Sequence, residues 1–245
     1  MARGPIHRDE GIVLRTYKLG EADRIVVLLT KARGKVRAVA KGVRKTKSKF
    51  GSRLEPMSHC ALQIYEGREL DLVTQAESLD TFRVLRDDLD RIARGMSMLE
   101  VVDQLAQEGL PNPELFRMLL GALRTLDSSA SPLVTPAFLW KVLALEGFRP
   151  EVEQCAVCGA VDEPLVAFDV DAGGLLCRTC RRGQSVSAPA VELLQQILGG
   201  RLNDALVMGE DERLRSAVHE VDLLATRAVE HHLERRLRSV DVLDH

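Results

Sequence analysis

The sequence predicts an α+β protein in which a small β-barrel is followed by a helical domain carrying an inserted four-cysteine zinc module. Three observations support this prediction. Short apolar segments typical of strands fill the first eighty residues, apolar residues after residue 80 recur at helical spacing, and four of the five cysteines form two Cys-x-x-Cys pairs. A chain of 245 residues is long enough for two or three small domains with buried cores.

Five short strands are expected within the first eighty residues. Turn signals at Gly20, Gly34 and Gly67 separate runs of apolar and β-branched residues, and a longer excursion separates the third run from the fourth. This spacing predicts a closed Greek-key barrel of the OB type over residues 1–80, with an SH3-like barrel as the alternative. The expected strands are 11–17, 24–30, 35–41, 59–65 and 70–75.

Helical spacing dominates the rest of the chain. Apolar residues recur every three or four positions from Leu89 to Val102, and Asn112 followed by Pro113 marks the start of a second helix. Further helices are expected over 135–147, 189–199 and 214–233. Because the apolar face of each helix must pack against another helix, we predict one helical domain from residues 81–150 and 187–245, interrupted by the zinc module at 151–186.

The two cysteine pairs are the most specific motif in the chain. Two residues separate the cysteines of each pair and eighteen residues separate the pairs, a spacing that suits a zinc ribbon or knuckle. One pair alone would leave a redox dithiol or plain buried cysteines as alternatives. Two pairs predict one structural Zn²⁺ with four thiolate ligands and no free position for a catalytic water. The predicted ligands are Cys155, Cys158, Cys177 and Cys180.

The usual enzyme signatures are absent from the sequence. It contains no phosphate-binding loop, no dinucleotide-binding glycine motif, no His-Glu-x-x-His and no Gly-x-Ser-x-Gly. A zinc deaminase needs His-x-Glu before its cysteines, whereas His232-Leu-Glu234 follows both pairs. We therefore expect a protein that is not an enzyme. No apolar run approaches the ~18 residues of a membrane span and the metal-type thiols suit a reducing compartment, so we expect a cytoplasmic protein without a membrane partner.

Charge is segregated along the chain. Residues 1–80 contain 16 Lys and Arg against 10 Asp and Glu, whereas the remaining residues contain 18 against 26. Residues 31–53 contain ten basic residues and no acidic one, which favours a polyanionic partner over an idle charged surface. A cationic strand face followed by a cationic mobile loop suits a phosphate backbone. The predicted contacts are Lys35, Arg37, Lys41, Arg44, Lys45, Lys47, Lys49 and Arg53.

Three single residues near this segment also carry expectations. Tyr17 and Phe50 are candidate platforms for base stacking, although each also fits a core or rim position. Cys60 falls at an apolar position of the fourth expected strand, so it is most simply a small core residue.

Several motifs along the chain together point to one known family. They are the two cysteine pairs, residues 239–243, and residues 10–14 (Glu-Gly-Ile-Val-Leu), 20–24 (Gly-Glu-Ala-Asp-Arg), 35–44 with Ser48, and 65–70. In these motifs the chain resembles the bacterial recombination mediator RecO over nearly its whole length, which implies an N-terminal OB-fold, a helical domain with a zinc module, and a nucleoid-associated location. The resemblance also implies binding of single- and double-stranded DNA, annealing of complementary strands, and cooperation with RecR, which helps RecA displace single-strand-binding protein in gap and break repair.

Two other functions stay open on the residues alone. A protein with a zinc ribbon and an OB-fold could be an RNA-binding transcription or translation factor, which a preference for RNA would indicate. An unrecognised nucleic-acid enzyme would reveal itself by hydrolysis or ATP turnover.

The acidic helical half is assigned to protein contacts, and the resemblance adds the tail of single-strand-binding protein, with Arg117, Arg124 and Lys141 as candidate contacts.

Overall fold

The computed structural model describes residues 5–234 and Leu237, and it divides into two compact units. One unit contains the residues up to Asp127, and the other begins at Ser128. The sequence predicted a boundary at residue 80 and a single helical domain across 81–150 and 187–245, and these domain limits stay a prediction. The first unit extends to Asp127 because charged contacts tie the first helices to the barrel. The family-like residues 239–243 lie outside the described residues.

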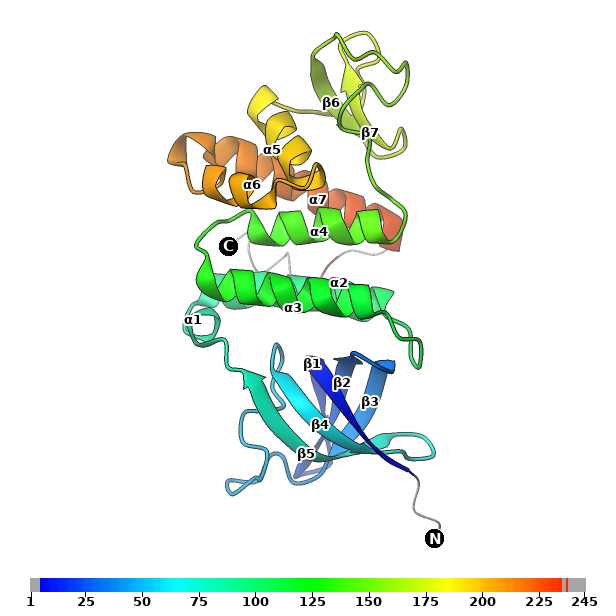
Figure 1. The fold of residues 1–245 in the computed structure, drawn as a ribbon, viewed down its shortest axis with the longest axis vertical. Coiled ribbons are helices and arrows are strands. Elements are labelled where there is room, and N and C mark those ends of the chain that lie inside the picture. Colours follow the sequence, from blue (N-terminus) through cyan, green and yellow to red (C-terminus); the bar gives the residue numbers. More distant parts are fainter. Residues whose placement is uncertain (1–4, 235–236, 238–245) are drawn as a thin grey trace. The chain divides into compact units, whose positions relative to one another are not determined.

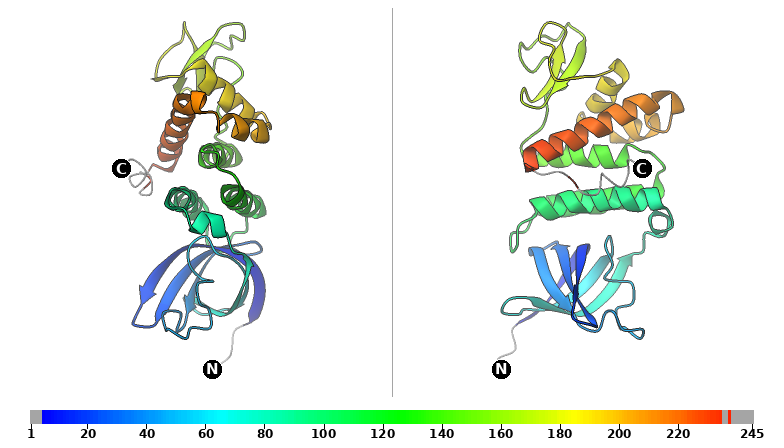
Figure 2. Two further views of the ribbon diagram at one scale, coloured as in Figure 1. Left: turned by 90° about the vertical axis from the view of Figure 1, so that its left-hand side faces the viewer. Right: turned by 180° about the vertical axis from the view of Figure 1, so that it is seen from behind.

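The first unit contains a closed five-stranded barrel, which agrees with the predicted OB-type fold (Figures 1 and 2). Its strands follow the spatial order β1-β2-β3-β5-β4, and β4 pairs back onto β1. All pairings are antiparallel except that of β3 with β5. The strands are β1 (Ile6–Leu19), β2 (Asp23–Thr30), β3 (Gly34–Ala40), β4 (His59–Tyr65) and β5 (Asp71–Asp80).

Alternation along β3 explains which side chains fill the barrel. Val36, Ala38 and Ala40 are buried in the barrel core, whereas Lys35 and Arg37 lie on the outer side. Successive side chains of a strand point to opposite faces, so one apolar set of period two is sufficient to fix the register. The predicted inward and outward faces of this strand are confirmed.

Three helices complete the first unit: α1 (Arg83–Arg86), α2 (Leu89–Leu105) and α3 (Pro113–Ser128). The side chain of Asp88 caps α2 by accepting from the amide of Arg91, and Asn112 accepts from the amide of Leu115 at the start of α3. Pro113 at the first position of α3 needs no hydrogen-bond partner there. The Asn112-Pro113 signal that predicted the start of α3 therefore has a direct structural counterpart.

The chain after α2 approaches the barrel closely at Gly34. This residue has φ of 70°, and a Cβ atom there would lie 2.1 Å from the carbonyl oxygen of Leu110. The amide of Lys35 donates to the carbonyl of Gln107, and the amide of Gly109 donates to the carbonyl of Lys35. Only glycine fits both the backbone conformation and the contact, so this position joins the start of β3 to the segment after α2.

A buried histidine links three strands and helix α3. Nε2 of His59 lies 2.9 Å from a carboxylate oxygen of Glu10, and Nδ1 lies 2.7 Å from Asp80. Lys31 pairs with Glu10 and Arg124 of α3 pairs with Asp80. Burial alone would raise the pKa of both carboxyl groups, but hydrogen bonds from their cationic neighbours and from the histidine lower the pKa of each. These hydrogen bonds and ion pairs hold α3 against the barrel.

The second unit combines helices with a small three-stranded sheet of order β7-β6-β8. The sheet lies in the segment between α4 and α5, where the sequence predicted the cysteine module. Ser187 caps α5, as the sequence suggested, by accepting from the amide of Ala190. The elements are α4 (Val134–Leu145), β6 (Leu165–Asp169), β7 (Gly174–Cys177), β8 (Gln184–Ser185), α5 (Ala188–Leu198), α6 (Leu202–Met208), the 3-10 turn η1 (Glu212–Leu214) and α7 (Arg215–Leu233).

None of the helices among the described residues is long and apolar enough to cross a membrane.

Candidate nucleic-acid interface and metal centre

The four cysteines of the two pairs lie close together in the second unit. Their Sγ atoms are all within 4.8 Å of one another, and those of Cys158 and Cys177 are 3.8 Å apart. The first pair lies on a turn in which the amide of Gly159 donates to the carbonyl of Cys155, and the second pair begins at the end of β7. The structure thus confirms that the four predicted ligands lie close enough to share one ion. They are Cys155, Cys158, Cys177 and Cys180.

The protonation chemistry of these thiols suits a bound cation. Backbone amides of Cys158 and Cys177 donate to the sulfur of Cys155 and lower the pKa of that thiol to about 6. The neighbouring thiol of Cys158, together with burial, raises the pKa of Cys180 to about 12. Because thiolates this close repel one another, all four ionise together only around a positive ion. The donor set therefore fits a structural metal ion.

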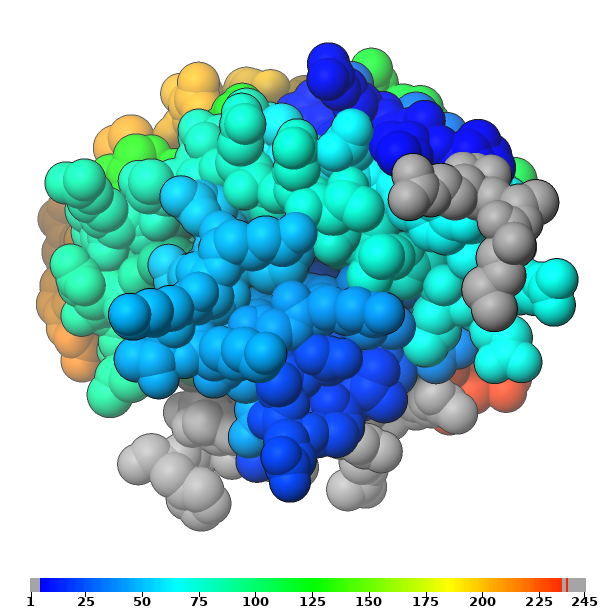
Figure 3. All heavy atoms as spheres, turned by 90° about the horizontal axis from the view of Figure 1, so that it is seen from below, coloured from blue at the N-terminus to red at the C-terminus, as the bar shows by residue number. Residues whose placement is uncertain are grey.

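The basic segment after β3 forms an irregular loop over residues 41–58 at the barrel surface (Figure 3, the light-blue part of the chain). Three buried side chains, Val43, Phe50 and Leu54, anchor it in the barrel core. The amide of Arg44 donates to the carbonyl of Ala22, which attaches the loop to the turn between β1 and β2. The sequence predicted a flexible loop here, and the structure shows one that is fastened at several points.

Six basic side chains of this loop are exposed and have no carboxylate partner among the described residues. Their polar contacts are to backbone oxygens: Arg44 donates to the carbonyl of Gly20 and Lys49 to that of Thr74. Such contacts leave the positive charge uncompensated, and phosphates can therefore compete for it. The six residues are Lys41, Arg44, Lys45, Lys47, Lys49 and Arg53, and we call them the loop cations.

The basic residues before the loop have a different environment. The ammonium of Lys35 donates to the carbonyl oxygen of Asp103 at 2.6 Å and lies 3.6 Å from its carboxylate, while Arg37 lies 3.9 Å from Glu108. Two further cations outside the predicted set, Lys31 and Arg33, also pair with acidic residues. The structure therefore separates the predicted contacts into two acid-paired residues of β3 and six unpaired residues of the loop.

Asp103 and Glu108 were not found by sequence reasoning. Asp103 lies on α2, 68 residues after Lys35, and Glu108 follows the end of that helix. Asp103 also accepts an ion pair from Arg15 of β1 at 2.8 Å. A contact between residues this far apart has no local signal in a single sequence.

The two aromatic residues considered for stacking differ in position. Phe50 is buried in the barrel core, so it offers no stacking face. Tyr17 is 42% exposed near the end of β1, and the guanidinium of Arg15 lies 4.9 Å from its ring centroid. Cys60 is fully buried as predicted, and burial raises the pKa of its thiol to about 11.

The candidate contacts on the helices belong to two different units. Arg117 and Arg124 belong to α3 in the first unit, where Arg124 already pairs with Asp80. Lys141 belongs to α4 in the second unit, and burial lowers the pKa of its amine.

Comparison with known proteins identifies the family of this chain. A family model for the N-terminal part of recombination protein O matches residues 1–82, and a model for its C-terminal part matches residues 86–241. A protein from Nocardioides sp. described as DNA repair protein RecO is 46% identical over 243 residues, which cover 96% of this chain and 98% of the relative. Proteins with the same description from Frankia casuarinae and Thermobifida fusca are 44% and 43% identical, over 98% of this chain and 99% and 98% of the relatives. The chain belongs to the RecO family of DNA repair proteins.

Proposed function

We propose that this protein is a DNA-binding recombination mediator. In this proposal it anneals complementary strands and, together with RecR, helps load RecA onto DNA coated by single-strand-binding protein. The observation that carries the proposal is the set of six loop cations, which are exposed on an OB-type barrel and lack carboxylate partners.

The chemistry of the loop cations favours binding without sequence preference. Ammonium and guanidinium groups at a surface contact phosphates, and phosphate contacts position a nucleic acid but carry no base information. Such contacts suit both single- and double-stranded DNA, because both present a repeating phosphate chain. A mediator that acts on any damaged sequence requires this kind of binding.

The eight predicted DNA contacts differ in whether an acidic residue already pairs with them. Lys35 and Arg37 hold acidic partners in the first unit, so we assign them to the attachment of the helical segment rather than to DNA. We assign DNA contact to the loop cations, from Lys41 to Arg53. Tyr17 is a further candidate for stacking with one base, since its ring is partly exposed.

We further propose that the cysteine cluster holds one Zn²⁺ with a structural role. Cys155, Cys158, Cys177 and Cys180 provide four sulfur donors, the set typical of closed tetrahedral zinc sites. When bound, the ion supplies charge neutralisation and cross-links the two turns. A fully ligated ion leaves no position for substrate, which agrees with a protein that acts by binding and not by catalysis.

Protein partners are assigned chiefly to the helical segments, which carry the acidic excess of the chain. We propose RecR and the tail of single-strand-binding protein as direct partners, with RecA affected indirectly. Arg117 is the exposed cation of α3 that best suits an acidic tail, because Arg124 is engaged with Asp80.

The decisive experiment mixes heat-denatured complementary strands that are coated with single-strand-binding protein and follows duplex formation after the protein is added. We expect annealing at a rate that depends on protein concentration and falls with salt. Binding of DNA without annealing of coated strands would contradict the mediator role. A clear preference for RNA over DNA of the same sequence would instead support an RNA-binding transcription or translation factor.

A further inference from the structure

The four cysteines of the metal centre differ in how well the protein covers them. Cys155 and Cys177 are buried, with 1% and 0% of their surface exposed, and Cys180 is half-buried. Cys158 is the exposed member of the cluster, and Val157 beside it in the same turn is 51% exposed. A small reagent that diffuses to the metal centre therefore meets Cys158 before the other three sulfurs.

Backbone amides add to this difference. The amides of Cys158 and Cys177 donate to the sulfur of Cys155, and the amide of Cys180 donates to the sulfur of Cys177. A bound ion keeps all four groups as thiolates, so access and nucleophilicity decide which of them reacts. A sulfur that accepts hydrogen bonds holds its electrons more tightly and attacks an electrophile more slowly. Burial and hydrogen bonding thus protect the same two sulfurs.

A second sulfur lies within reach of Cys158. Its Sγ atom is 3.8 Å from that of Cys177. Because the sulfurs of a disulfide are about 2 Å apart, a relative shift of about 2 Å would join these two. The turn that carries the first pair is also fastened to β7 without an ion, since the amide of Ala156 donates to the carbonyl of Leu175 at 2.9 Å. Cys158 and Cys177 are therefore held near each other by the backbone as well as by a metal.

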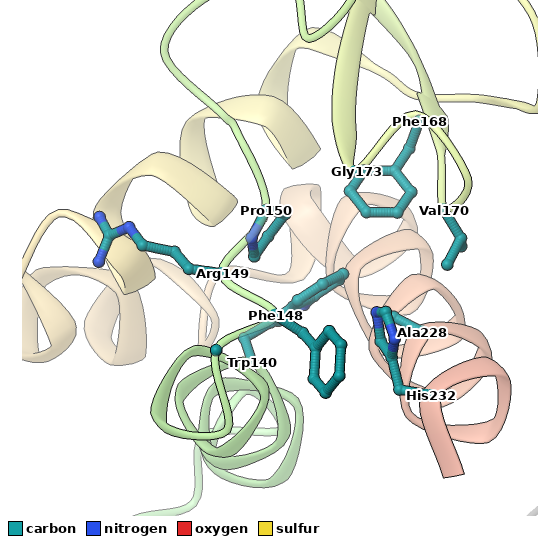
Figure 4. Close-up of a pocket in the computed structure, with 10 residues that line it drawn as sticks. Trp140, Phe148, Arg149, Pro150, Phe168, Val170, Gly173, Ala228 and His232 are labelled. Atoms are coloured by element: carbon teal, nitrogen blue, oxygen red, sulfur yellow. The ribbon is translucent and has the colours of Figure 1, made fainter. Parts of the chain in front are cut away.

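The sheet of the module is attached to the helices by a contact of its own. Phe168 of β6 packs edge-on against Trp140 of α4, with ring centroids 5.5 Å apart and an interplanar angle of 66°, and Figure 4 shows both residues. Around the cysteines the fully buried apolar core is small and includes only Ala167 and Leu176 besides two of the sulfurs. Loss of a metal ion should therefore loosen the two cysteine turns and leave the contact between β6 and α4 in place.

We propose that Cys158 is a site of oxidation by peroxides, through which the metal centre opens and releases its ion. This inference rests on the proposed Zn²⁺ and is independent of the proposed DNA binding. It assigns the exposed thiolate a reactivity that the three better covered thiolates lack.

The reaction has two steps. The thiolate of Cys158 attacks one oxygen of hydrogen peroxide, the O–O bond breaks, hydroxide leaves and a sulfenic acid forms. The thiolate of Cys177 then attacks that sulfur, a second hydroxide leaves and a disulfide between Cys158 and Cys177 forms. The two thiolates have lost two electrons, which the peroxide has taken up, and water supplies the two protons that convert the peroxide oxygens to water. The site has lost two of its four ligands, and a dithiol reductant restores them.

Release of zinc and the position of the disulfide test the proposal. The full-length zinc-loaded protein is treated with hydrogen peroxide, and released zinc is followed with a chromophoric zinc indicator after catalase has removed the excess peroxide. We expect one ion per chain to be released, and dithiothreitol with added zinc to reverse the change. Digestion after acidic residues such as Asp162 separates the two pairs, and digestion after Arg178 separates Cys177 from Cys180. Mass spectrometry with fragmentation should then find Cys158 linked to Cys177.

Two histidine variants distinguish the exposed sulfur from the others. Cys158→His replaces the exposed thiolate by another zinc donor, and closed sites with three cysteines and one histidine are common. It should retain zinc and release it at least about tenfold more slowly under peroxide, because covered thiolates react little. The matched control, Cys180→His, makes the same exchange at a half-buried ligand and should release zinc as fast as the unaltered protein. Fluorescence of Trp140, the single tryptophan of the chain, reports on the contact with Phe168 and should stay unchanged.

Several results would overturn the inference. Equal rates of release in the two variants would refute a special role of Cys158, and a disulfide within either pair would refute Cys177 as its partner. If the variants bind no zinc, limited alkylation of the unaltered zinc-loaded protein with iodoacetamide decides: Cys158 should be labelled first, and earlier labelling of another cysteine would refute the proposal. Purified protein without zinc would contradict the proposed metal site and remove the premise, whereas salt-dependent DNA binding would be unaffected by that result.

Discussion

Neutralising part of the loop should change how DNA binding depends on salt. We consider the triple variant Lys41→Gln, Arg44→Gln and Lys45→Gln. All three side chains are exposed, and none has a carboxylate partner among the described residues. Among the contacts of the described residues, the substitutions remove only the hydrogen bond from Arg44 to the carbonyl of Gly20. The variant should therefore fold normally while it loses half of the loop cations.

The size of the effect follows from the number of cations. If each of the six loop cations neutralises one phosphate, the slope of log K against log salt on single strands is about −4, because each contact releases roughly 0.7 counterions. The triple variant retains three and should show a slope of about −2. Raising the salt from 50 to 200 mM then weakens binding by about 300-fold for the unaltered protein and by about 20-fold for the variant.

Fluorescence anisotropy of labelled single strands over this salt range measures both slopes. The matched control, Arg201→Gln with Arg213→Gln and Arg215→Gln, makes the same change in net charge at exposed positions of the second unit. It should keep the slope of the unaltered protein. An unchanged slope in the folded loop variant, or an equal reduction in the control, would refute the assignment of DNA contact to the loop.

Three further predictions concern stability and the metal site. Cys180→Ser should reduce bound zinc below one ion per chain in elemental analysis and lower the Tm, since the ion contributes folding free energy; full zinc retention would exclude this ligand. Gly34→Ala should lower the free energy of unfolding by about 1–3 kcal/mol in urea titrations, because its φ is 70° and the new Cβ would meet Leu110; an unchanged value would mean that the segment after α2 moves freely. The folded state lowers the pKa of Glu10 and of Asp80. Their contribution to the free energy of unfolding is therefore complete above the pKa values of the unfolded chain and declines as the pH falls through the lowered pKa values of the folded state. Asp80→Asn should make the free energy of unfolding, measured in urea titrations at several acidic pH values, fall less steeply as the pH is lowered.

The fold was largely predictable where the controlling signal is local. The alternation of Val36, Ala38 and Ala40 along one strand is sufficient to place them in a barrel, because side chains of a strand alternate between its faces. The helix start at Asn112 follows from capping preferences that act within one turn. Cysteine spacing predicted the thiol cluster for a similar reason, since each pair is positioned by its own turn.

What could not be predicted depends on contacts between distant segments. Nothing near Lys35 indicates that Asp103 neutralises it, so the sequence assigned eight basic residues to one surface without distinguishing the paired from the unpaired. The stacking of Phe148, in the loop after α4, on His232 of α7 joins two segments that are far apart in the chain. The attachment of α2 and α3 to the barrel likewise depends on side chains that only the folded chain brings together.

The carboxylate of Asp103 has a consequence for the path of a bound strand. It pairs with Lys35 and Arg15, two cations that could otherwise attract a phosphate under the proposed DNA binding. Asp103 therefore competes with phosphates for these two cations, and we expect a bound strand to follow the loop cations, which have no carboxylate partner among the described residues. We expect Asp103→Asn to free Arg15 and Lys35 from this carboxylate and to broaden the DNA footprint, so that a residue of α2 would help to determine where DNA lies.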